Sequence, residues 1–398
     1  MRASILVHSF RSAVLREKST NPSSILQTRS ISAYGYTQSK SLIYSTYGTP
    51  SEVLNLHTHS ISPPHGSLVT LRTLAAPLNP ADINQIQGTY PSKPTFSTAL
   101  GTSQPAAVPG NEAVFEVQAV GSSVKTVKQG DWVVPARTGL GTWRTHLQID
   151  EDQVMRVERQ GLQPAHAATV TVNPLTAWRM LTDFVHLEPG RDWFIQNGAN
   201  SGVGRAALQL GKLWGLKSIA VVRDRPGQEG ERLKKELLDL GATRVVSEEE
   251  SQTGEFASQI KTWMSESGTS GSAVRLALNC VGGKPAVALA KVLAPGGCMV
   301  TYGAMSKQPL SLPAGLLIFK NLRFEGFWVS KWGDEHPEDR RKCIGGVLDL
   351  VREGKFTMGP TMDVRWDFKT PKEGLVTAVQ DTLEGYRKGK GMFVFGDT

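Results

Sequence analysis

The chain has little cysteine and no long apolar run, and both absences narrow the class of protein. Its three cysteines are Cys280, Cys298 and Cys343, and none falls among the first 279 residues. An odd number placed in this way argues against a disulfide framework and favours a reducing compartment. No stretch approaches the ~18 to 20 uninterrupted apolar residues that span a bilayer, so we expect no membrane insertion.

The composition is typical of a globular protein. Hydrophobic residues make up 39% and charged residues 20% of the 398 positions. A chain of this length holds about two domains, each with a core of its own. We find no internal repeat in it.

Acidic residues are almost absent from the first 36 positions. This segment has one acid and eight serines, an apolar stripe that begins at Ile5 and Leu6, and five basic residues, Arg2, Arg11, Arg16, Lys18 and Arg29. The pattern predicts an organelle transit peptide, and a disordered tail is the alternative. Without the segment the formal net charge falls from +8 to about +4, so the basicity of the whole chain does not imply a nucleic-acid partner.

After this segment, the pattern of apolar residues changes once along the chain. From about Ser41 to Met155, short apolar runs such as "EAVFEVQAVG" alternate with Gly and Pro, which predicts a curled, mostly antiparallel β domain. From about Val170, apolar runs alternate with helical stretches such as "ERLKKELLDLGA", which predicts a doubly wound parallel sheet in an α/β fold. The expected strands of that sheet are "WFIQN", "SIAVVR", "TRVVS", "RLALNCV", "CMVTYG" and "LRFEGFWV".

A glycine-rich turn, "NGANSGVG", joins the first of these strands to an amphipathic helix. The free N–H groups and the dipole at the start of a helix favour a phosphate, and Gly202 and Gly204 allow a close approach of the backbone. The spacing is not the strict G-x-G-x-x-G pattern, so a turn needed only for packing is the alternative.

The second strand ends in Arg223, Asp224 and Arg225. An acid at this place usually binds the ribose 2′-hydroxyl of NAD, whereas two guanidinium groups bind a 2′-phosphate. We therefore predict NADP(H), with a solvated surface cluster of charges as the alternative.

Several long motifs in one order resemble a known family. "PGNEAVFEVQAVGSSVKTVKQGDWVVPA" and "NGANSGVGRAALQLG" are similar to the medium-chain dehydrogenase/reductase superfamily over about Ser41 to Phe395. Within it, "LNPADINQIQGTYP", "GLGTWRT", "TVNPLTAWRMLTDF", "ALNCVGGK" and "LLIFKNLRFEGFWVSKW" resemble the mitochondrial trans-2-enoyl-thioester reductases. The resemblance implies three parts: a mitochondrial transit peptide at 1–36, a GroES-like domain at 37–170 completed by about 355–398, and a Rossmann domain at 171–354.

The missing cysteines agree with a zinc-free branch of that superfamily. Zinc-dependent members supply cysteine ligands from the first domain, and this chain has none there. Its histidines in that half, His57, His59, His65 and His146, do not follow a ligand spacing. We expect no metal site.

The resemblance also implies the site residues. The catalytic tyrosine corresponds to Tyr90 in "GTYPSKP", whose hydroxyl would stabilise and protonate an enolate; a packed loop aromatic is the alternative. The sequence does not decide whether Phe327 and Trp328 form a wall of the site or are core aromatics at the end of a strand. Ala304 stands where the family usually has glycine. The expected cofactor contacts are Asn173, Asn200, Ser201, Gly202, Val203, Arg223, Asp224, Arg225, Tyr302, Gly303, Ala304, Met305, Phe327, Trp328, Val329, Ser330 and Lys390.

The resemblance implies a homodimeric, NADPH-dependent reductase of trans-2-enoyl thioesters, carried on acyl carrier protein or coenzyme A, in fatty-acid synthesis of the mitochondrial matrix. An NADPH:quinone oxidoreductase is the alternative within enzymes. A non-catalytic NADP(H)-binding regulator is the alternative from another class.

Overall fold

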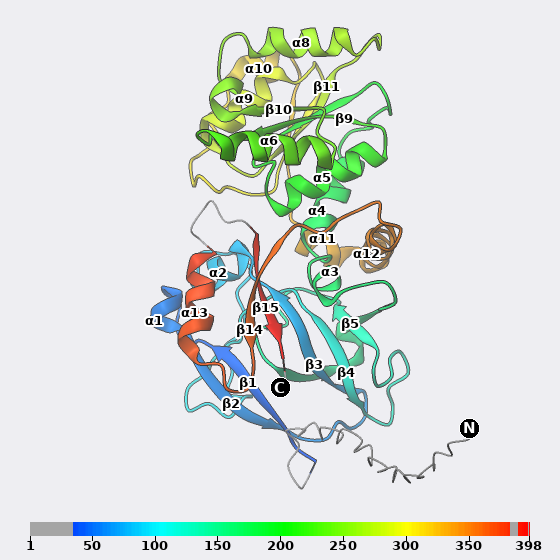
Figure 1. Ribbon diagram of the computed structural model, residues 1–398. Coiled ribbons are helices and arrows are strands. Elements are labelled where there is room, and N and C mark those ends of the chain that lie inside the picture. Colours follow the sequence, from blue (N-terminus) through cyan, green and yellow to red (C-terminus); the bar gives the residue numbers. More distant parts are fainter. Residues whose placement is uncertain (1–34, 383–388, 397) are drawn as a thin grey trace, which may run out of the picture.

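A computed structural model describes residues 35–382, 389–396 and 398, so all but two residues of the predicted transit peptide lie outside the described part. The molecule is built from two units, a β-rich unit below and an α/β unit above (Figure 1). This division agrees with the predicted fold class. Within the described residues, no helix has the length and apolar character needed to cross a membrane.

The lower unit is centred on a seven-stranded sheet with the order β14-β15-β3-β4-β5-β7, in which β6 also pairs with β3. Its strands are β3 (Leu68–Pro77), β4 (Val114–Val120), β5 (Trp132–Pro135), β6 (His146–Asp150), β7 (Val154–Val157), β14 (Thr361–Trp366) and β15 (Lys390–Phe395). A separate antiparallel pair, β1 (Thr37–Ile43) and β2 (Asn55–Ile61), lies beside it. The sheet therefore joins segments from both ends of the chain.

The upper unit is a parallel six-stranded sheet with the order β10-β9-β8-β11-β12-β13. The strands are β8 (Trp193–Gln196), β9 (Lys217–Val222), β10 (Arg244–Ser247), β11 (Val274–Asn279), β12 (Cys298–Thr301) and β13 (Arg323–Gly326). They coincide with the six apolar runs of the sequence. Because β8 and β11 are neighbours with crossovers to opposite sides, the strand order reverses between them, and ligands of such sheets bind outside the carboxyl ends at that point.

Helices cover this sheet on both faces (Figure 1). They are α5 (Gly202–Leu213), α6 (Gln228–Leu240), α8 (Phe256–Glu266), α9 (Gly283–Val292) and α10 (Ala314–Ile318). In α5, Val203, Ala206, Ala207 and Leu210 form the buried stripe expected from the 3.6-residue period. This stripe fixes α5 against the sheet and so orients its first turn.

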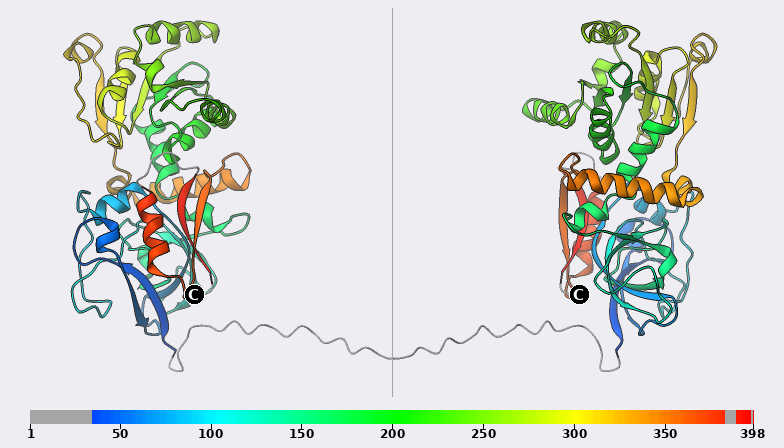
Figure 2. Two further views of the ribbon diagram at one scale, coloured as in Figure 1. Left: turned by 60° about the vertical axis from the view of Figure 1, so that its left-hand side comes forward. Right: turned by 90° about the vertical axis from the view of Figure 1, so that its right-hand side faces the viewer.

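The two units meet along a layer of helices that includes α4 (Asn173–Asp183) and α12 (Pro337–Arg352). The right-hand view of Figure 2 shows α12 lying across the junction. From this helix the buried Arg340 reaches down to the carbonyl oxygen of Pro135 at 3.5 Å, which ties α12 to the end of β5.

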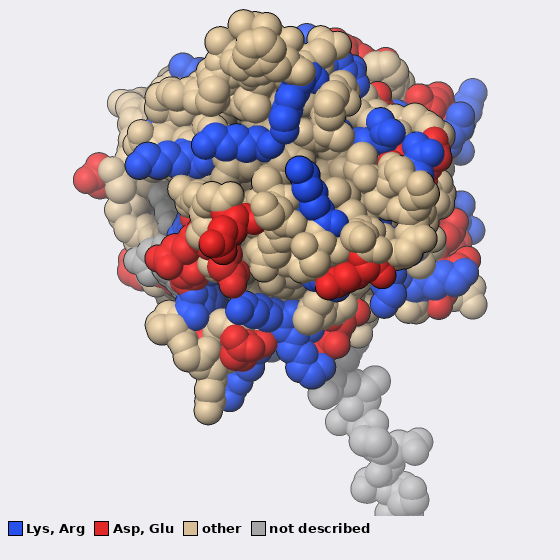
Figure 3. Space-filling view, turned by 90° about the horizontal axis from the view of Figure 1, so that it is seen from above, with Lys and Arg blue, Asp and Glu red and all other residues tan. Residues whose placement is uncertain are grey.

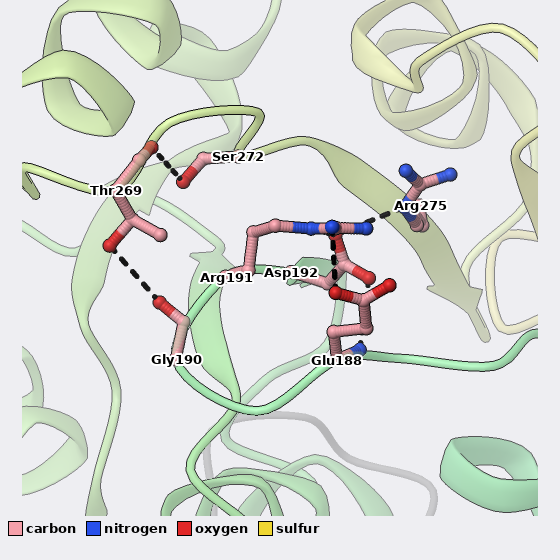
Figure 4. Close-up of polar contacts among 7 residues, drawn as sticks. All are labelled: Glu188, Gly190, Arg191, Asp192, Thr269, Ser272 and Arg275. Carbon is pink, nitrogen blue, oxygen red and sulfur yellow. Dashed lines mark hydrogen bonds and ion pairs between the residues drawn. The ribbon is translucent and has the colours of Figure 1, made fainter.

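A buried carboxylate holds the amino ends of two upper strands together. Asp192 is 1% exposed and accepts hydrogen bonds from the Glu188 backbone N–H at 2.9 Å and from Arg275 Nε at 3.0 Å. Figure 4 shows Arg191 beside the same carboxylate oxygen that Arg275 contacts, with its guanidinium also pairing with Glu188. This cluster lies just before β8 and β11, at the edge of the sheet opposite their carboxyl ends.

Seen from above, the described residues carry acidic and basic side chains interspersed over the upper unit (Figure 3). Such a mixed surface does not have the continuous positive field of a nucleic-acid-binding face.

Candidate active site

The glycine-rich turn lies between β8 and α5, at the carboxyl edge of the upper sheet. Ser201 is the N-cap residue of α5, and its hydroxyl accepts a hydrogen bond from the Gly204 N–H at 3.1 Å. Asn200 precedes it, and Gly202 and Val203 form the first turn of the helix. The first N–H groups of this helix thus face the cleft side of the sheet, where an anion is favoured.

The glycines of the turn have no room for a side chain. A Cβ atom on Gly202 would clash with the Asn173 amide, and one on Gly204 would lie 2.5 Å from the Ala199 backbone. Gly198 has a φ of +56°, and a Cβ there would lie 2.5 Å from Cys280 Sγ. The turn is therefore a tight backbone cradle, and Asn173, from the start of α4, closes one side of it. This geometry fits a dinucleotide phosphate.

Two buried asparagines, which the sequence analysis did not select, hold the cradle in place. Asn197 donates to Asn279 Oδ1 at 2.8 Å, and its own Oδ1 accepts from the Cys280 N–H at 2.8 Å. The side chains thereby join the carboxyl ends of β8 and β11. Their signal in the sequence is a single asparagine at the end of each apolar run.

The three charged residues after β9 lie at the same edge. Arg223 and Asp224 are exposed, and Arg225 is half-buried and pairs with Glu229. A cavity of about 300 Å³ is lined by these residues together with Ser247 from the end of β10 and parts of α6. The lining also includes Lys234 and the acids Glu231, Glu249 and Glu250, so the cavity presents both guanidinium groups and carboxylates.

The segments after β12 and β13 complete this edge. Tyr302 and Gly303 are half-buried, whereas Ala304 and Met305 are exposed. A Cβ on Gly303 would lie 3.2 Å from Cys280, so the segment runs close against the end of β11. Burial raises the pKa of the Tyr302 hydroxyl well above its usual value, so it stays protonated at neutral pH.

Phe327, Trp328 and Val329 separate into two environments, and Ser330 after them is half-buried. The Phe327 ring packs edge-on against Phe184 at 5.8 Å, and Val329 is buried in the cluster that includes Leu175. Trp328 is instead 38% exposed. Phe327 is therefore a packing residue by its contacts, while Trp328 is partly exposed.

Tyr90 meets Trp328 across the boundary between the two units. Their ring centroids are 6.0 Å apart with planes at 83°, an edge-to-face contact. The Tyr90 N–H donates to the Asn84 carbonyl at 3.1 Å, so the end of α2 (Pro80–Ile86) holds the loop. Burial raises the pKa of the Tyr90 hydroxyl, the contact with the Trp328 indole lowers it, and the Asp82 carboxylate raises it further. The hydroxyl is a proton donor at neutral pH.

A buried polar network under the tyrosine loop was not predicted from the sequence. Asn111 donates to Asp82 Oδ1 at 2.5 Å and to Gln85 Oε1 at 2.7 Å. Gln85 in turn donates to the Ser92 carbonyl at 3.1 Å, two residues beyond Tyr90. Asn111 therefore anchors both α2 and the loop that carries the tyrosine.

Lys390 lies at the start of β15 and reaches the same network. Its Nζ donates to Asn79 Oδ1 at 2.5 Å, and Asn79 is the N-cap residue of α2. The predicted residues of the lower unit, Tyr90 and Lys390, thus both lie around α2. The roles of the individual site residues remain predictions.

The cysteines and histidines of the described part form no metal cluster. In residues 35–382, 389–396 and 398 there is no group of three or more His, Cys, Asp or Glu able to hold a metal ion. Cys280, Cys298 and Cys343 are buried and free. His57 and His59, treated as scattered in the sequence analysis, stack with ring centroids 5.8 Å apart.

Two family models match the chain. Residues 65–159 match the alcohol dehydrogenase GroES-like domain, and residues 202–344 match the zinc-binding dehydrogenase family. The matched segments fall in the lower and the upper unit, respectively.

Relatives match over nearly the whole chain. The mitochondrial enoyl-(acyl-carrier-protein) reductase of Yarrowia lipolytica is 44% identical over 352 residues, which cover 88% of this chain and 90% of that protein. A solved complex of Etr1p with NADP and crotonyl-CoA has 40% identity and a TM-score of 0.85, covering 90% of this chain and 99% of that one. The mitochondrial 2-enoyl thioester reductase Etr1p/Etr2p heterodimer from Candida tropicalis gives the same identity, TM-score and coverage.

Proposed function

The chain belongs to the mitochondrial enoyl-(acyl-carrier-protein) reductases of the medium-chain dehydrogenase/reductase superfamily, and on this premise we propose how its own residues carry out the reaction. It is an NADPH-dependent reductase that converts trans-2-enoyl thioesters to acyl thioesters at the C2=C3 bond, in mitochondrial fatty-acid synthesis. When bound, NADPH supplies the hydride that C3 receives.

The residues of the carboxyl edge bind and orient the cofactor. The turn from Asn200 to Val203 binds the pyrophosphate through backbone N–H groups at the start of α5, with Asn173 beside it. Arg223 and Arg225 bind the 2′-phosphate, which explains the preference for NADPH over NADH. Trp328 forms a wall beside the nicotinamide end of the cofactor, and Lys390 lies on the side of the lower unit.

Tyr90 acts on the substrate. Negative charge develops on the thioester oxygen as C3 is reduced, and a hydroxyl donor near that oxygen or near C2 stabilises the enolate and supplies its proton. The observation that carries this proposal is the contact of Tyr90 with Trp328, because it brings the donor of one unit to the cofactor edge of the other.

The test is NADPH oxidation by purified protein with trans-2-enoyl thioesters of several chain lengths, on coenzyme A and on acyl carrier protein, beside a panel of quinones. We expect turnover with the thioesters and a saturable dependence on chain length. Turnover with quinones alone would favour the quinone oxidoreductase. Cofactor binding without oxidation of any substrate would favour the non-catalytic regulator.

A homodimer is supported by an apolar surface at one edge of the upper sheet. β13 is the last strand of that sheet, paired only with β12 among the described residues. Beside it, the end of α10 exposes Ile318 by 69% and Phe319 by 84%. An edge strand with exposed apolar neighbours is suited to pair with a second copy.

The oligomeric state tests this surface directly. We expect light scattering to give a dimer for the wild type and a monomer for Phe319→Glu. A monomeric wild type would refute the homodimer.

The protein is mitochondrial, as its relatives are named, and we propose the matrix as its compartment. The acid-poor, serine-rich composition of 1–36 supports a matrix address. A fusion of these residues to a fluorescent protein should enter the matrix, and a diffuse cytosolic signal would contradict the prediction.

A further inference from the structure

One buried acid lies next to the cofactor side of the cleft and has no part in the mechanism above. Glu112 is fully buried, in the segment "PGNE" that leads into β4. Its Oε2 accepts a hydrogen bond from Asn79 Nδ2 at 3.0 Å, while Asn79 Oδ1 accepts from Lys390 Nζ at 2.5 Å. A single amide therefore connects the carboxylate to the ammonium group.

The orientation of that amide follows from its two partners. A flipped Asn79 would direct its NH₂ group at the Lys390 ammonium and its oxygen at the carboxylate, and both contacts would be repulsive. The backbone N–H of Asn79 donates to Asp82 Oδ2 at 2.8 Å, which fixes the residue at the start of α2. Lys390 is thus held at one position by a chain of hydrogen bonds that ends at Glu112.

Hydrogen-bond donors and charged groups surround the Glu112 side chain. Thr171 donates to Oε1 at 2.9 Å, so each carboxylate oxygen has a side-chain donor. The charged groups that face the cluster are Asp82 from α2, Lys390 from β15 and Arg340 from α12, and Arg340 is 1% exposed. A buried carboxylate is retained at such a place only where cations and donors offset the cost of its desolvation.

We propose that Glu112 is a positioning residue for the reaction: through the Asn79 amide it holds the Lys390 side chain, charged, at the cofactor side of the cleft. This inference rests on the proposed function, in which Lys390 contacts NADPH.

The electrostatics point in the same direction as the geometry. Burial lowers the pKa of the Lys390 ammonium, and the Glu112 and Asp82 carboxylates oppose this by favouring the charged form. Loss of the Glu112 charge removes part of that opposition. More of Lys390 is then neutral in mildly alkaline solution, and a neutral lysine attracts an anionic cofactor less.

The experiment measures the Kd of NADPH by cofactor fluorescence between pH 7 and pH 10, without substrate, so that the ionisation of Tyr90 in turnover does not enter. Glu112→Gln keeps the shape and can still accept from Asn79 Nδ2, its NH₂ group then donating to the Thr171 hydroxyl, and it removes the charge. Glu112→Asp keeps the charge. Glu116→Gln is the matched control, because Glu116 lies on β4 and pairs with Arg72 at 2.9 Å, away from this cluster.

We expect the alkaline rise of Kd to move down by about one pH unit in Glu112→Gln, since a nearby opposite charge shifts a pKa by about one unit or more. The Kd of Glu112→Gln for NADPH is then about tenfold higher than that of the wild type near pH 10, and the difference is smaller at pH 7. Glu116→Gln should keep the wild-type profile, and Glu112→Asp, which retains the charge on a shorter side chain, should keep the wild-type pH of the alkaline rise. A folded Glu112→Gln protein with an unshifted profile would overturn the proposal.

Two further variants keep the test decisive. If Glu112→Gln does not fold because the buried Arg340 loses one of the two carboxylates that offset its charge, the double variant Glu112→Gln, Arg340→Met removes both charges and should show the same downward shift; an unshifted profile there overturns the proposal. Lys390→Met separates the two hypotheses. A wild-type Kd in that variant refutes the cofactor contact and the inference with it, whereas a raised Kd beside an unshifted Glu112→Gln profile refutes the inference alone.

Discussion

Replacement of Tyr90 by phenylalanine isolates the hydroxyl that the proposed mechanism requires. The ring keeps its edge-to-face contact with Trp328, and the backbone keeps its hydrogen bond to Asn84. The folded structure and the cofactor edge should therefore remain as they are. The proton donor is lost, together with the polar contact between the hydroxyl and the Trp328 indole.

The expected magnitude follows from the state of that hydroxyl. Because burial raises the pKa of Tyr90, the group is protonated at neutral pH and donates in every molecule of the enzyme. Loss of a positioned proton donor or of an oxyanion contact lowers a rate by about 10²- to 10⁴-fold. We expect a fall of kcat in this range on a trans-2-enoyl thioester, with the Kd of NADPH within about twofold of wild type.

The assay is NADPH oxidation on crotonyl-CoA, with cofactor affinity measured separately by fluorescence. Tyr47→Phe is a suitable control, because this tyrosine packs on Phe96 beside the same loop and loses the same atom. Its kcat should stay near wild type. A rate for Tyr90→Phe within about threefold of wild type would remove Tyr90 from the mechanism, and the proton would have to come from water or another hydroxyl.

Three further predictions concern cofactor choice, stability and pH. Replacing Arg223 and Arg225 together with alanine should raise the KM for NADPH by about 10- to 1,000-fold and leave NADH use little changed; equal losses would indicate a structural role. Asp192→Asn should lower the free energy of unfolding in denaturant by about 1 to 3 kcal/mol, because the arginines left behind are partly exposed, whereas Asp239→Asn, in an exposed pair, should change it by under about 1 kcal/mol. Burial raises the pKa of Asp82 from its ordinary value of 3.8 to about 6 in the folded protein. Protonated Asp82 therefore contributes fully to the free energy of unfolding below pH 3.8, and this contribution is lost as the pH rises through about 6. Unfolding titrations from pH 4 to pH 7 should show this loss, of up to about 3 kcal/mol, in the wild type and not in Asp82→Asn.

The elements of the upper unit were accessible from the sequence because each strand is a short apolar run followed by a turn. "WFIQN" became β8 and "SIAVVR" became β9, and the glycine turn lies where the strand-to-helix transition predicted it. Strand identity is a local property of such runs. Trp328 and Tyr90 are different, because their contact depends on how two units pack, and neither local pattern contains that information.

The polar network was missed for a related reason. Asn79, Asp82 and Glu112 stand in the motifs "LNPADINQIQGTYP" and "PGNE", which were used only to identify the family. A buried glutamate and an exposed one look alike in a sequence. Their burial here follows from the convergence of α2, β4 and β15, three segments that are distant along the chain.

The position of β15 in the lower sheet determines which of the two sheets can form first. This strand, at residues 390–395, inserts between β14 and β3, in the interior of the lower sheet rather than at its edge. The strands of the upper unit, from 193 to 326, are contiguous in the chain and can pair as soon as they emerge from a ribosome or a translocation channel. The lower sheet cannot be completed until residues 390–395 are available, and pairing between segments so distant along a chain is in general slow. Because Lys390 is the first residue of β15, the hydrogen bond between Lys390 and Asn79 can form only after residues 390–395 have joined the sheet.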